Sequence, residues 1–281
     1  MPELPEVETI RLGLQKYLVG HTIEKVEVRL SKIIQGDVKD IIGAKVTGVR
    51  RFGKGLVIDL DNNYSIAIHI KLTGQIIYKD EKVSNVSEVS KEKVGSVPNK
   101  WTHVIFHLDR GGFLYYNDLR QFGWIRIVQS SKLKDESFFS DLGPEPLNNL
   151  TIQQFNNIIS SSKTSIKPLL MDQKKISGIG NIYANDALFG AKIDPRRKAK
   201  SLTQEEVNRL YNSILTVLKR GLQYGGASEL SYVNALGQEG EYQKHFLVYA
   251  QQGKPCKNCG TKIQKIKLLG RGTYFCPRCQ Q

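Results

Sequence analysis

The chain begins Met1-Pro-Glu-Leu-Pro-Glu-Val-Glu8, and the interpretation of the whole sequence depends on this stretch. Its two prolines suit the first turn of a helix, where a backbone N–H would be unpaired anyway. Its glutamates favour the positive end of a helix macrodipole. Apolar residues then recur at helical spacing as far as Gly20. The stretch therefore predicts an N-terminal helix.

The same residues also permit a catalytic interpretation. Removal of Met1, which the small Pro2 favours, would leave a secondary amine at the N-terminus. Such an amine can attack carbon and form an imine without a lysine. Glu3 would lie beside this nucleophile, where a carboxyl group can transfer a proton. On these residues alone, a simple helix start and a catalytic N-terminus both stay open.

Length and charge limit the classes of protein to be considered. The 281 residues are enough for two modest domains. A net charge of +14 favours a polyanionic partner, with a membrane surface as the alternative. No apolar run reaches the roughly 18 residues of a membrane span, and no secretory signal precedes the first helix. We therefore expect a cytoplasmic protein.

Strand patterns fill residues 22–129, where apolar and polar residues alternate between turn residues. The predicted strands are 22–30, 45–51, 56–60, 64–70, 74–78, 103–108, 113–117 and 124–129. Short strands at this spacing predict a β-sandwich or a barrel. Residues 79–100 are polar and charged, and we interpret them as a long loop or insertion.

The chain changes character after this β-rich part. Helical patterns with capping residues predict helices at 151–161, 166–172, 181–189 and 202–222. The predicted fold class is α+β with several domains. Its predicted parts are a β-sandwich domain at 1–130, a linker at 131–150, a helical domain at 151–245 that ends in the loop 227–245, and a cysteine module at 246–281.

The cysteine module predicts a metal site. Its two Cys-x-x-Cys pairs, Cys256 with Cys259 and Cys276 with Cys279, are separated by sixteen residues. Each pair can bring two thiolates to one side of a zinc ion. Disulfides are the alternative, but they are rare in a reducing cytoplasm. Four thiolates leave no open position, so we expect one structural Zn²⁺, with Arg271 on the turn between two short strands.

Several motifs together resemble the bacterial formamidopyrimidine-DNA glycosylases, which excise oxidised purines. The first eight residues resemble the N-terminus of that family. Arg271-Gly-Thr273 between the cysteine pairs resembles its zinc finger, and Gly178-Ile-Gly-Asn-Ile182 resembles its helix–two-turns–helix motif. The resemblance runs from Pro2 to Gln280, apart from residues 79–100. It implies an N-terminal helix with a β-sandwich, then a helix–two-turns–helix domain with a lesion-capping loop, then a zinc finger.

The resemblance also implies catalytic roles. In the family, the Pro2 amine attacks C1′ and displaces the base, and Glu3 protonates the opening sugar. Lys54 and Arg271 assist β- and then δ-elimination. From the residues alone, Lys54 could equally be a surface lysine of a hairpin, and Arg271 a solvated arginine.

Seven further residues match DNA-binding positions of the family. They are His69, Leu72, Arg120, Phe122, Lys163, Lys167 and Asn181. Leu72, Arg120 and Phe122 map to the wedge that fills the hole left by an extruded nucleotide. Asn181 maps to a phosphate contact, and the two lysines map near DNA and the lesion pocket. The alternatives place Leu72 and Phe122 in the core and the lysines in solvent.

Three residues depart from the family pattern. Leu72 replaces a methionine, Lys71 replaces a glycine, and Trp101 stands where a histidine is usual. Leucine keeps the bulk of methionine and loses some of its adaptability. Because Trp101 stands in place of the usual histidine, a DNA contact at this position stays open.

The function that the resemblance implies is a bifunctional DNA glycosylase and AP lyase of base excision repair. It would remove 8-oxoguanine and formamidopyrimidines from duplex DNA through an imine at Pro2, followed by β,δ-elimination. The family is monomeric and acts on the bacterial nucleoid, without a membrane partner. One alternative is an endonuclease-VIII-like enzyme for oxidised pyrimidines, which Leu4 disfavours because that enzyme usually has glycine there. The other is a non-catalytic zinc DNA-binding protein, which the Pro2-Glu3 pair disfavours.

Overall fold

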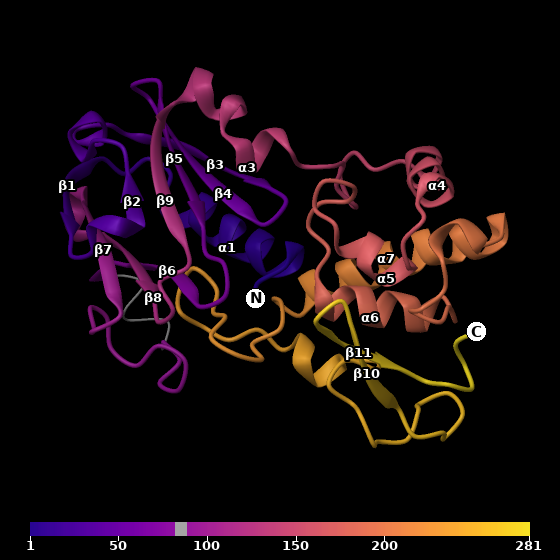
Figure 1. Cartoon of the computed structure of the whole chain (residues 1–281). Coiled ribbons are helices and arrows are strands. Elements are labelled where there is room, and N and C mark those ends of the chain that lie inside the picture. The colour runs from indigo at the N-terminus through magenta and orange to yellow at the C-terminus, as the bar shows by residue number, and fades with distance from the viewer. Residues whose placement is uncertain (82–88) are drawn as a thin grey trace. The chain divides into compact units, whose positions relative to one another are not determined.

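The computed structural model describes residues 1–81 and 89–281, so residues 82–88 of the predicted insertion lie outside the described residues. The helices are α1 Leu4–Tyr17, α3 Ser137–Ser140, α4 Ile152–Ser161, α5 Ile166–Met171, α6 Asn181–Gly190 and α7 Gln204–Gln223 (Figure 1). The strands are β1 Ile23–Val28, β2 Ile34–Gln35, β3 Val46–Phe52, β4 Gly55–Leu60, β5 Tyr64–His69, β6 Gly74–Lys79, β7 Thr102–Leu108, β8 Phe113–Asp118, β9 Trp124–Gln129, β10 Gln264–Leu268 and β11 Arg271–Phe275.

The chain forms two compact units. Unit 1 contains Met1–Ser140 and Leu222–Gln243, and unit 2 contains Asp141–Gly221 and Lys244–Gln281. The segment that the sequence predicts as a loop of the helical domain therefore lies largely in unit 1.

Unit 1 is built on two sheets, with strand orders β1-β7-β8-β6 and β2-β9-β5-β4-β3. Alternation along the strands turns one face of each sheet inward, as with Ile58 of β4 and Val104 of β7. Both residues belong to one core that also takes in Ile10 and Leu14 of α1. The β-sandwich with its N-terminal helix is thus confirmed.

The strand predictions hold because their signal is local. All eight predicted strands are present, with ends that differ by at most two residues, as at β1. The exception is β2, which pairs in parallel with β9 through only Ile34 and Gln35. A two-residue strand is too short to carry an alternating pattern, so the sequence did not predict it.

Unit 2 combines helices with one hairpin. Thr151 caps α4 as predicted, since its Oγ1 accepts a hydrogen bond from Gln154 N and its own N–H donates to Gln154 Oε1. Helix α6 is buried along almost its whole length, from Ile182 to Phe189. Strands β10 and β11 pair antiparallel. The predicted helices and the two short strands of the cysteine module are all present.

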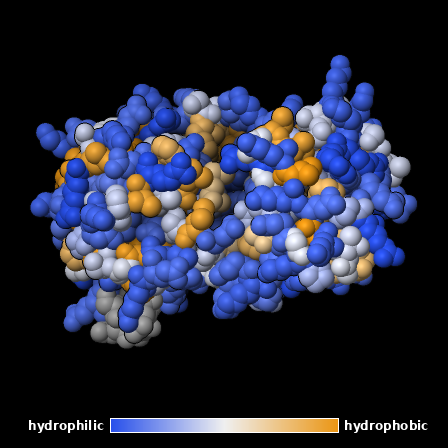
Figure 2. Space-filling view, turned by 60° about the horizontal axis from the view of Figure 1, so that its bottom comes forward, coloured by the Kyte–Doolittle hydropathy of each residue, from blue (hydrophilic) through white to orange (hydrophobic). Residues whose placement is uncertain are grey.

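The surface of the protein is largely hydrophilic on the face shown. Hydrophilic side chains cover most of the face shown in Figure 2, with apolar patches among them. Among the described residues, none of the helices combines the length and apolar character needed to cross a membrane.

Candidate functional site

The first turn of α1 holds the two residues predicted to start catalysis. Glu3 is the N-cap of α1, and Pro2 directly before it is buried. Glu6 Oε2 accepts a hydrogen bond of 2.8 Å from Glu3 N. Both glutamates are buried, at 2% and 1% exposure. The predicted helix start is confirmed, and it fixes the backbone of Glu3 in place.

Glu6 also binds a distant segment of unit 1, which the sequence did not predict. Its Oε1 accepts a hydrogen bond of 2.8 Å from Ala227 N. Gly226 approaches so closely that a Cβ there would lie 2.9 Å from Glu6 Cγ. The two carboxylate oxygens therefore join the N-terminus to the start of the loop 227–245.

Lys54 lies on the two-residue turn between β3 and β4. Gly53, the first residue of the turn, has a φ of 55°, which glycine adopts at no steric cost. Lys54 is only 5% exposed, so the surface alternative for this lysine is wrong.

Arg51 connects this turn to α1. Its Nη1 donates to Gly53 O and its Nε donates to Glu8 Oε2, both at 2.8 Å. Burial alone would raise the pKa of Glu8, but hydrogen bonds from Arg11 and Arg51 outweigh it and leave that pKa below its usual value. An ionised Glu8 thus ties the element that carries Glu3 to the turn that carries Lys54.

His69 is a neutral residue in this structure. Burial, with Lys71 and Lys54 nearby, lowers the pKa of its imidazole to about 3. Its Nδ1 accepts a hydrogen bond of 2.9 Å from Lys71 N, so the remaining proton resides on Nε2. A DNA contact by His69 stays a prediction, and any such contact would use this neutral tautomer as a donor.

The predicted wedge residues lie on two loops that Asp118 fastens together. Thr73 Oγ1 donates to Asp118 Oδ1 at 2.5 Å, and Gly123 N donates to Asp118 Oδ2 at 2.8 Å. Arg120 N donates to Thr73 Oγ1 at 2.9 Å. Asp118 is fully buried. The loop with Leu72 and the loop with Arg120 and Phe122 are therefore held side by side, an arrangement that sequence reasoning missed.

The wedge loops present apolar groups to the surface. Phe122 is 54% exposed, which excludes the core alternative for this residue. The guanidinium of Arg120 lies 4.8 Å from the centre of the Phe122 ring. Leu72 is half-buried and is not part of the core of unit 1. An exposed ring steadied by a cation is suited to contact a nucleobase.

Unit 2 carries the other predicted DNA-binding residues. Asn181 is the first residue of α6 and is half-buried, at a helix end whose N–H groups favour phosphate. Gly178 before it has a φ of 90°, a conformation that glycine readily adopts. Lys163 is exposed, whereas Lys167 is 1% exposed, so the solvated alternative is wrong for Lys167.

The four cysteines form a site that fits zinc. Their Sγ atoms all lie within 4.8 Å of one another, with 3.9 Å between Cys256 and Cys279 and 3.5 Å between Cys259 and Cys276. Four thiolates at about 2.3 Å from a tetrahedral zinc would be roughly 3.8 Å apart. All four cysteines are free of disulfides. The predicted structural zinc site is confirmed.

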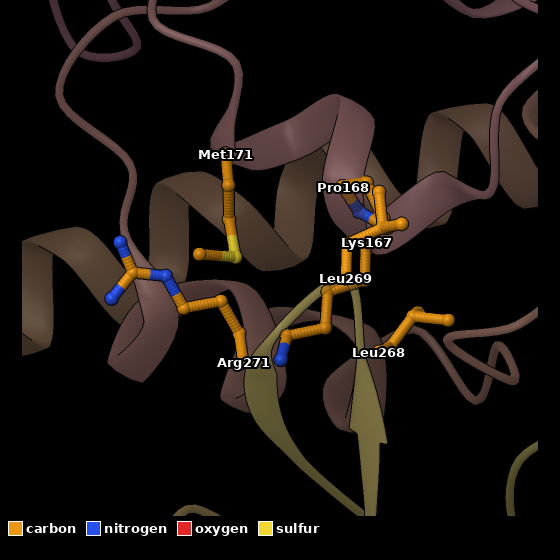
Figure 3. A pocket seen from close by; sticks show the side chains of 6 residues that line it. All are labelled: Lys167, Pro168, Met171, Leu268, Leu269 and Arg271. Carbon is orange, nitrogen blue, oxygen red and sulfur yellow. The ribbon is translucent and has the colours of Figure 1, made fainter.

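Arg271 lies at the start of β11, directly after the turn of the β10–β11 hairpin. The turn residues Leu269 and Gly270 have φ values of 43° and 77°. Arg271 is exposed and lines a pocket of about 240 Å³ with Lys167, Pro168, Met171, Leu268 and Leu269 (Figure 3). Arg271 thus belongs to unit 2, whereas Pro2, Glu3 and Lys54 belong to unit 1.

Comparison with known protein families accounts for nearly the whole chain. Residues 1–125 match the formamidopyrimidine-DNA glycosylase N-terminal domain, and residues 142–232 match the H2TH domain of the same enzymes. Residues 253–281 match the zinc finger found in FPG and IleRS.

Individual proteins give the same result. The formamidopyrimidine-DNA glycosylase of Heliobacterium modesticaldum is 40% identical over 287 aligned residues, with both chains covered completely. That of Listeria innocua is 38% identical, again with both chains covered completely. The complex between a Lactococcus lactis FPG mutant and Fapy-dG-containing DNA matches with a TM-score of 0.88 at 31% identity, and each chain is fully covered. The chain belongs to the formamidopyrimidine-DNA glycosylase family.

Proposed function

We propose that this protein is a bifunctional DNA glycosylase and AP lyase that removes oxidised purines from duplex DNA. The observation that carries the proposal is the Pro2-Glu3 pair at the buried start of α1, in a chain whose relatives are formamidopyrimidine-DNA glycosylases. A mutant of the Lactococcus lactis FPG has been solved with DNA that contains Fapy-dG, and the Lactococcus lactis FPG has been solved with DNA that contains an abasic site.

The proposed reaction starts at the N-terminal amine. After removal of Met1, the lone pair of Pro2 N attacks C1′ and the C1′–N bond to the base breaks, so that the base departs with the electron pair and takes up a proton. Glu3 gives a proton to O4′ as the sugar ring opens, which leaves an iminium ion. Loss of a C2′ proton then expels the 3′-phosphate, and a second elimination expels the 5′-phosphate. Lys54 and Arg271 assist these two eliminations.

The remaining site residues bind DNA in this proposal. Leu72, Arg120 and Phe122 fill the space left by the extruded nucleotide. His69, Lys163 and Asn181 complete the contacts, and the family resemblance places Lys167 near the DNA and the lesion pocket. The net charge of +14 supports a polyanionic partner of this kind. As in the family, the protein acts as a monomer on the bacterial nucleoid, and light scattering of the purified chain would test the monomer.

Borohydride trapping on 8-oxoguanine duplex DNA tests the mechanism. We expect a covalent adduct that mass spectrometry assigns to Pro2, and a chain that keeps Met1 should give none. Glu3→Gln should lower base excision by roughly 10²–10⁴-fold and affect a pre-formed abasic site less, because that aldehyde needs no base expelled. Glu24→Gln, an exposed carboxylate of unit 1, is the control for the lost charge.

Three outcomes would contradict the proposal. An adduct on Lys54 or another lysine, with an unmodified N-terminal peptide, would replace the nucleophile. Faster excision of oxidised pyrimidines than of 8-oxoguanine would favour the endonuclease-VIII-like alternative. Both lesion classes must be assayed because the Lactococcus lactis FPG has also been solved with oxidised-pyrimidine DNA. Lesion binding without any adduct would favour a non-catalytic DNA-binding protein.

A further inference from the structure

Lys167 is a buried charge with partners on the zinc-finger hairpin. It belongs to α5, and its side chain is among the largest fully buried ones in the protein. Its Nζ donates to Gly272 O at 2.8 Å and to Thr273 Oγ1 at 2.7 Å. A buried ammonium group needs such acceptors, because its desolvation is otherwise costly. Both acceptors lie on β11.

The hydroxyl of Thr273 continues this chain of hydrogen bonds to Arg271. It accepts from Lys167 and donates to Arg271 O at 3.2 Å. Successive hydrogen bonds of this kind polarise and strengthen one another. Figure 3 shows the Lys167 side chain running from α5 to the start of β11, while the Arg271 side chain extends away from it past Met171. Lys167 therefore holds the backbone of Arg271.

A second buried side chain fastens the same strand. Asn185 of α6 is 1% exposed, and its Oδ1 accepts a hydrogen bond of 2.8 Å from Tyr274 N. Its Nδ2 donates to Asn181 O at 2.6 Å. Strand β11 is thus tied to α5 through Lys167 and to α6 through Asn185. These bonds lie within unit 2 and fix Arg271 relative to Asn181.

We propose that Lys167 is a positioning residue for the phosphate contact of Arg271. Its ammonium charge is satisfied by β11, so its effect on DNA binding passes through Arg271. This inference rests on the proposed function, in which Arg271 binds a DNA phosphate. A direct DNA contact by Lys167 is the competing assignment, and the two make different predictions for a double variant.

The salt dependence of DNA binding separates the two assignments. Each lysine or arginine that neutralises a phosphate contributes about 0.9 to the slope of log affinity against log salt. The probe is a duplex with a tetrahydrofuran abasic analogue, which the enzyme binds without cleavage. Arg271→Ala should lower the slope by about 0.9. Lys167→Met should lower it by most of the same amount, because Arg271 loses its fixed geometry.

The double variant gives the decisive result. If Lys167 acts through Arg271, Lys167→Met with Arg271→Ala should show the same slope as Arg271→Ala alone. A further drop of about 0.9 would mean that Lys167 neutralises a phosphate itself, and it would overturn the proposal. Lys219→Met removes an exposed lysine of α7 and is the control for the lost charge.

Two further measurements keep a folding defect apart from a positioning effect. Lys167→Met should retain one zinc per chain and should still form the borohydride adduct at Pro2. If it loses zinc, Thr273→Val replaces it, since this variant keeps the shape of the side chain and removes only the hydroxyl relay. Two results would overturn the proposal. In the first, Thr273→Val and Lys167→Met both show the wild-type salt slope. In the second, Lys167→Met loses zinc and Thr273→Val shows the wild-type salt slope.

The result also distinguishes failure of the inference from failure of the proposed function. An unchanged slope for Arg271→Ala would remove Arg271 from the phosphate contacts, and this inference would fall with that contact. A lower slope for Arg271→Ala together with wild-type slopes for Lys167→Met and Thr273→Val would overturn the inference alone.

Discussion

Replacement of Glu6 by glutamine tests whether the first turn of α1 controls the catalytic N-terminus. The Glu6 carboxylate accepts two backbone hydrogen bonds of 2.8 Å, from Glu3 N and from Ala227 N. Burial raises the pKa of the adjacent Tyr232 well above its usual value, and the Glu6 charge adds to this effect. Glutamine has nearly the same shape, but it offers one acceptor and places an NH₂ group against the other N–H.

The expected cost follows from these two bonds. A hydrogen bond to a charged group contributes about 1.5–3 kcal/mol, and a buried N–H left without a partner costs about 1–3 kcal/mol. Because only one of the two bonds is lost, we expect Glu6→Gln to destabilise unit 1 by roughly 3 kcal/mol. This corresponds to a decrease in melting temperature of roughly 6–12 °C. Base excision should fall as well, since the segment that begins at Ala227 is no longer fixed to the first turn of α1 that carries Glu3.

Calorimetry and hydrogen exchange measure the two halves of this prediction. The melting temperature reports the stability, and the amide of Ala227 should exchange faster in Glu6→Gln than in the wild type. Glu24→Gln removes an exposed carboxylate and should melt within about 2 °C of the wild type, because surface substitutions rarely change stability by more than about 0.5 kcal/mol. A Glu6→Gln protein that melts like this control, with normal excision, would refute the reasoning.

Three further predictions concern the zinc, one buried histidine and the hairpin turn. Elemental analysis should find one zinc per chain, and Cys256→Ala should lose it and weaken DNA binding while unit 1 stays folded. Because the pKa of His69 is lowered to about 3, the folded state gains no proton there as the pH falls from 6.5, whereas the unfolded state does. His69 should therefore cost about 1.4 kcal/mol of stability per pH unit below 6.5, and His69→Gln should show a smaller loss between pH 7 and 5.5 in denaturant titrations. Leu269→Asn should stabilise unit 2 by roughly 1 kcal/mol in the same titrations. Asparagine tolerates the left-handed conformation that Leu269 adopts at a φ of 43°. An unchanged or lower stability would argue against strain at this turn.

The parts of the site that sequence reasoning predicted depend on short-range signals. The two Cys-x-x-Cys pairs predict a zinc site because each pair alone brings two thiolates together. The Lys54 turn is predicted by its flanking strands and by Gly53. Resemblance to a family then supplied the chemical roles, which spacing alone does not give.

The parts that were missed depend on contacts between distant residues. Glu6 and Ala227 are separated by 221 positions, and Lys167 and Thr273 by 106. In the sequence, Glu6 is explained equally well by the macrodipole of α1, and Lys167 by a solvated surface. Neither residue carries a local signal for its partner. Only the folded chain shows which of several polar residues is buried and what it binds.

These buried residues explain how exposed catalytic and binding groups keep their geometry. Phe122 is on an exposed loop and Arg271 is exposed at the start of β11, where a side chain alone would lose much of its orientation. A buried side chain forms hydrogen bonds with each of these segments: Lys167 with β11 in unit 2, and Asp118 with the loop after β8 in unit 1. Because such a residue binds backbone groups of the segment, its removal leaves those groups unpaired and loosens the segment itself. Substitution of Asp118 by leucine should therefore impair the wedge more than substitution of the exposed Leu119, although only Leu119 is at the surface.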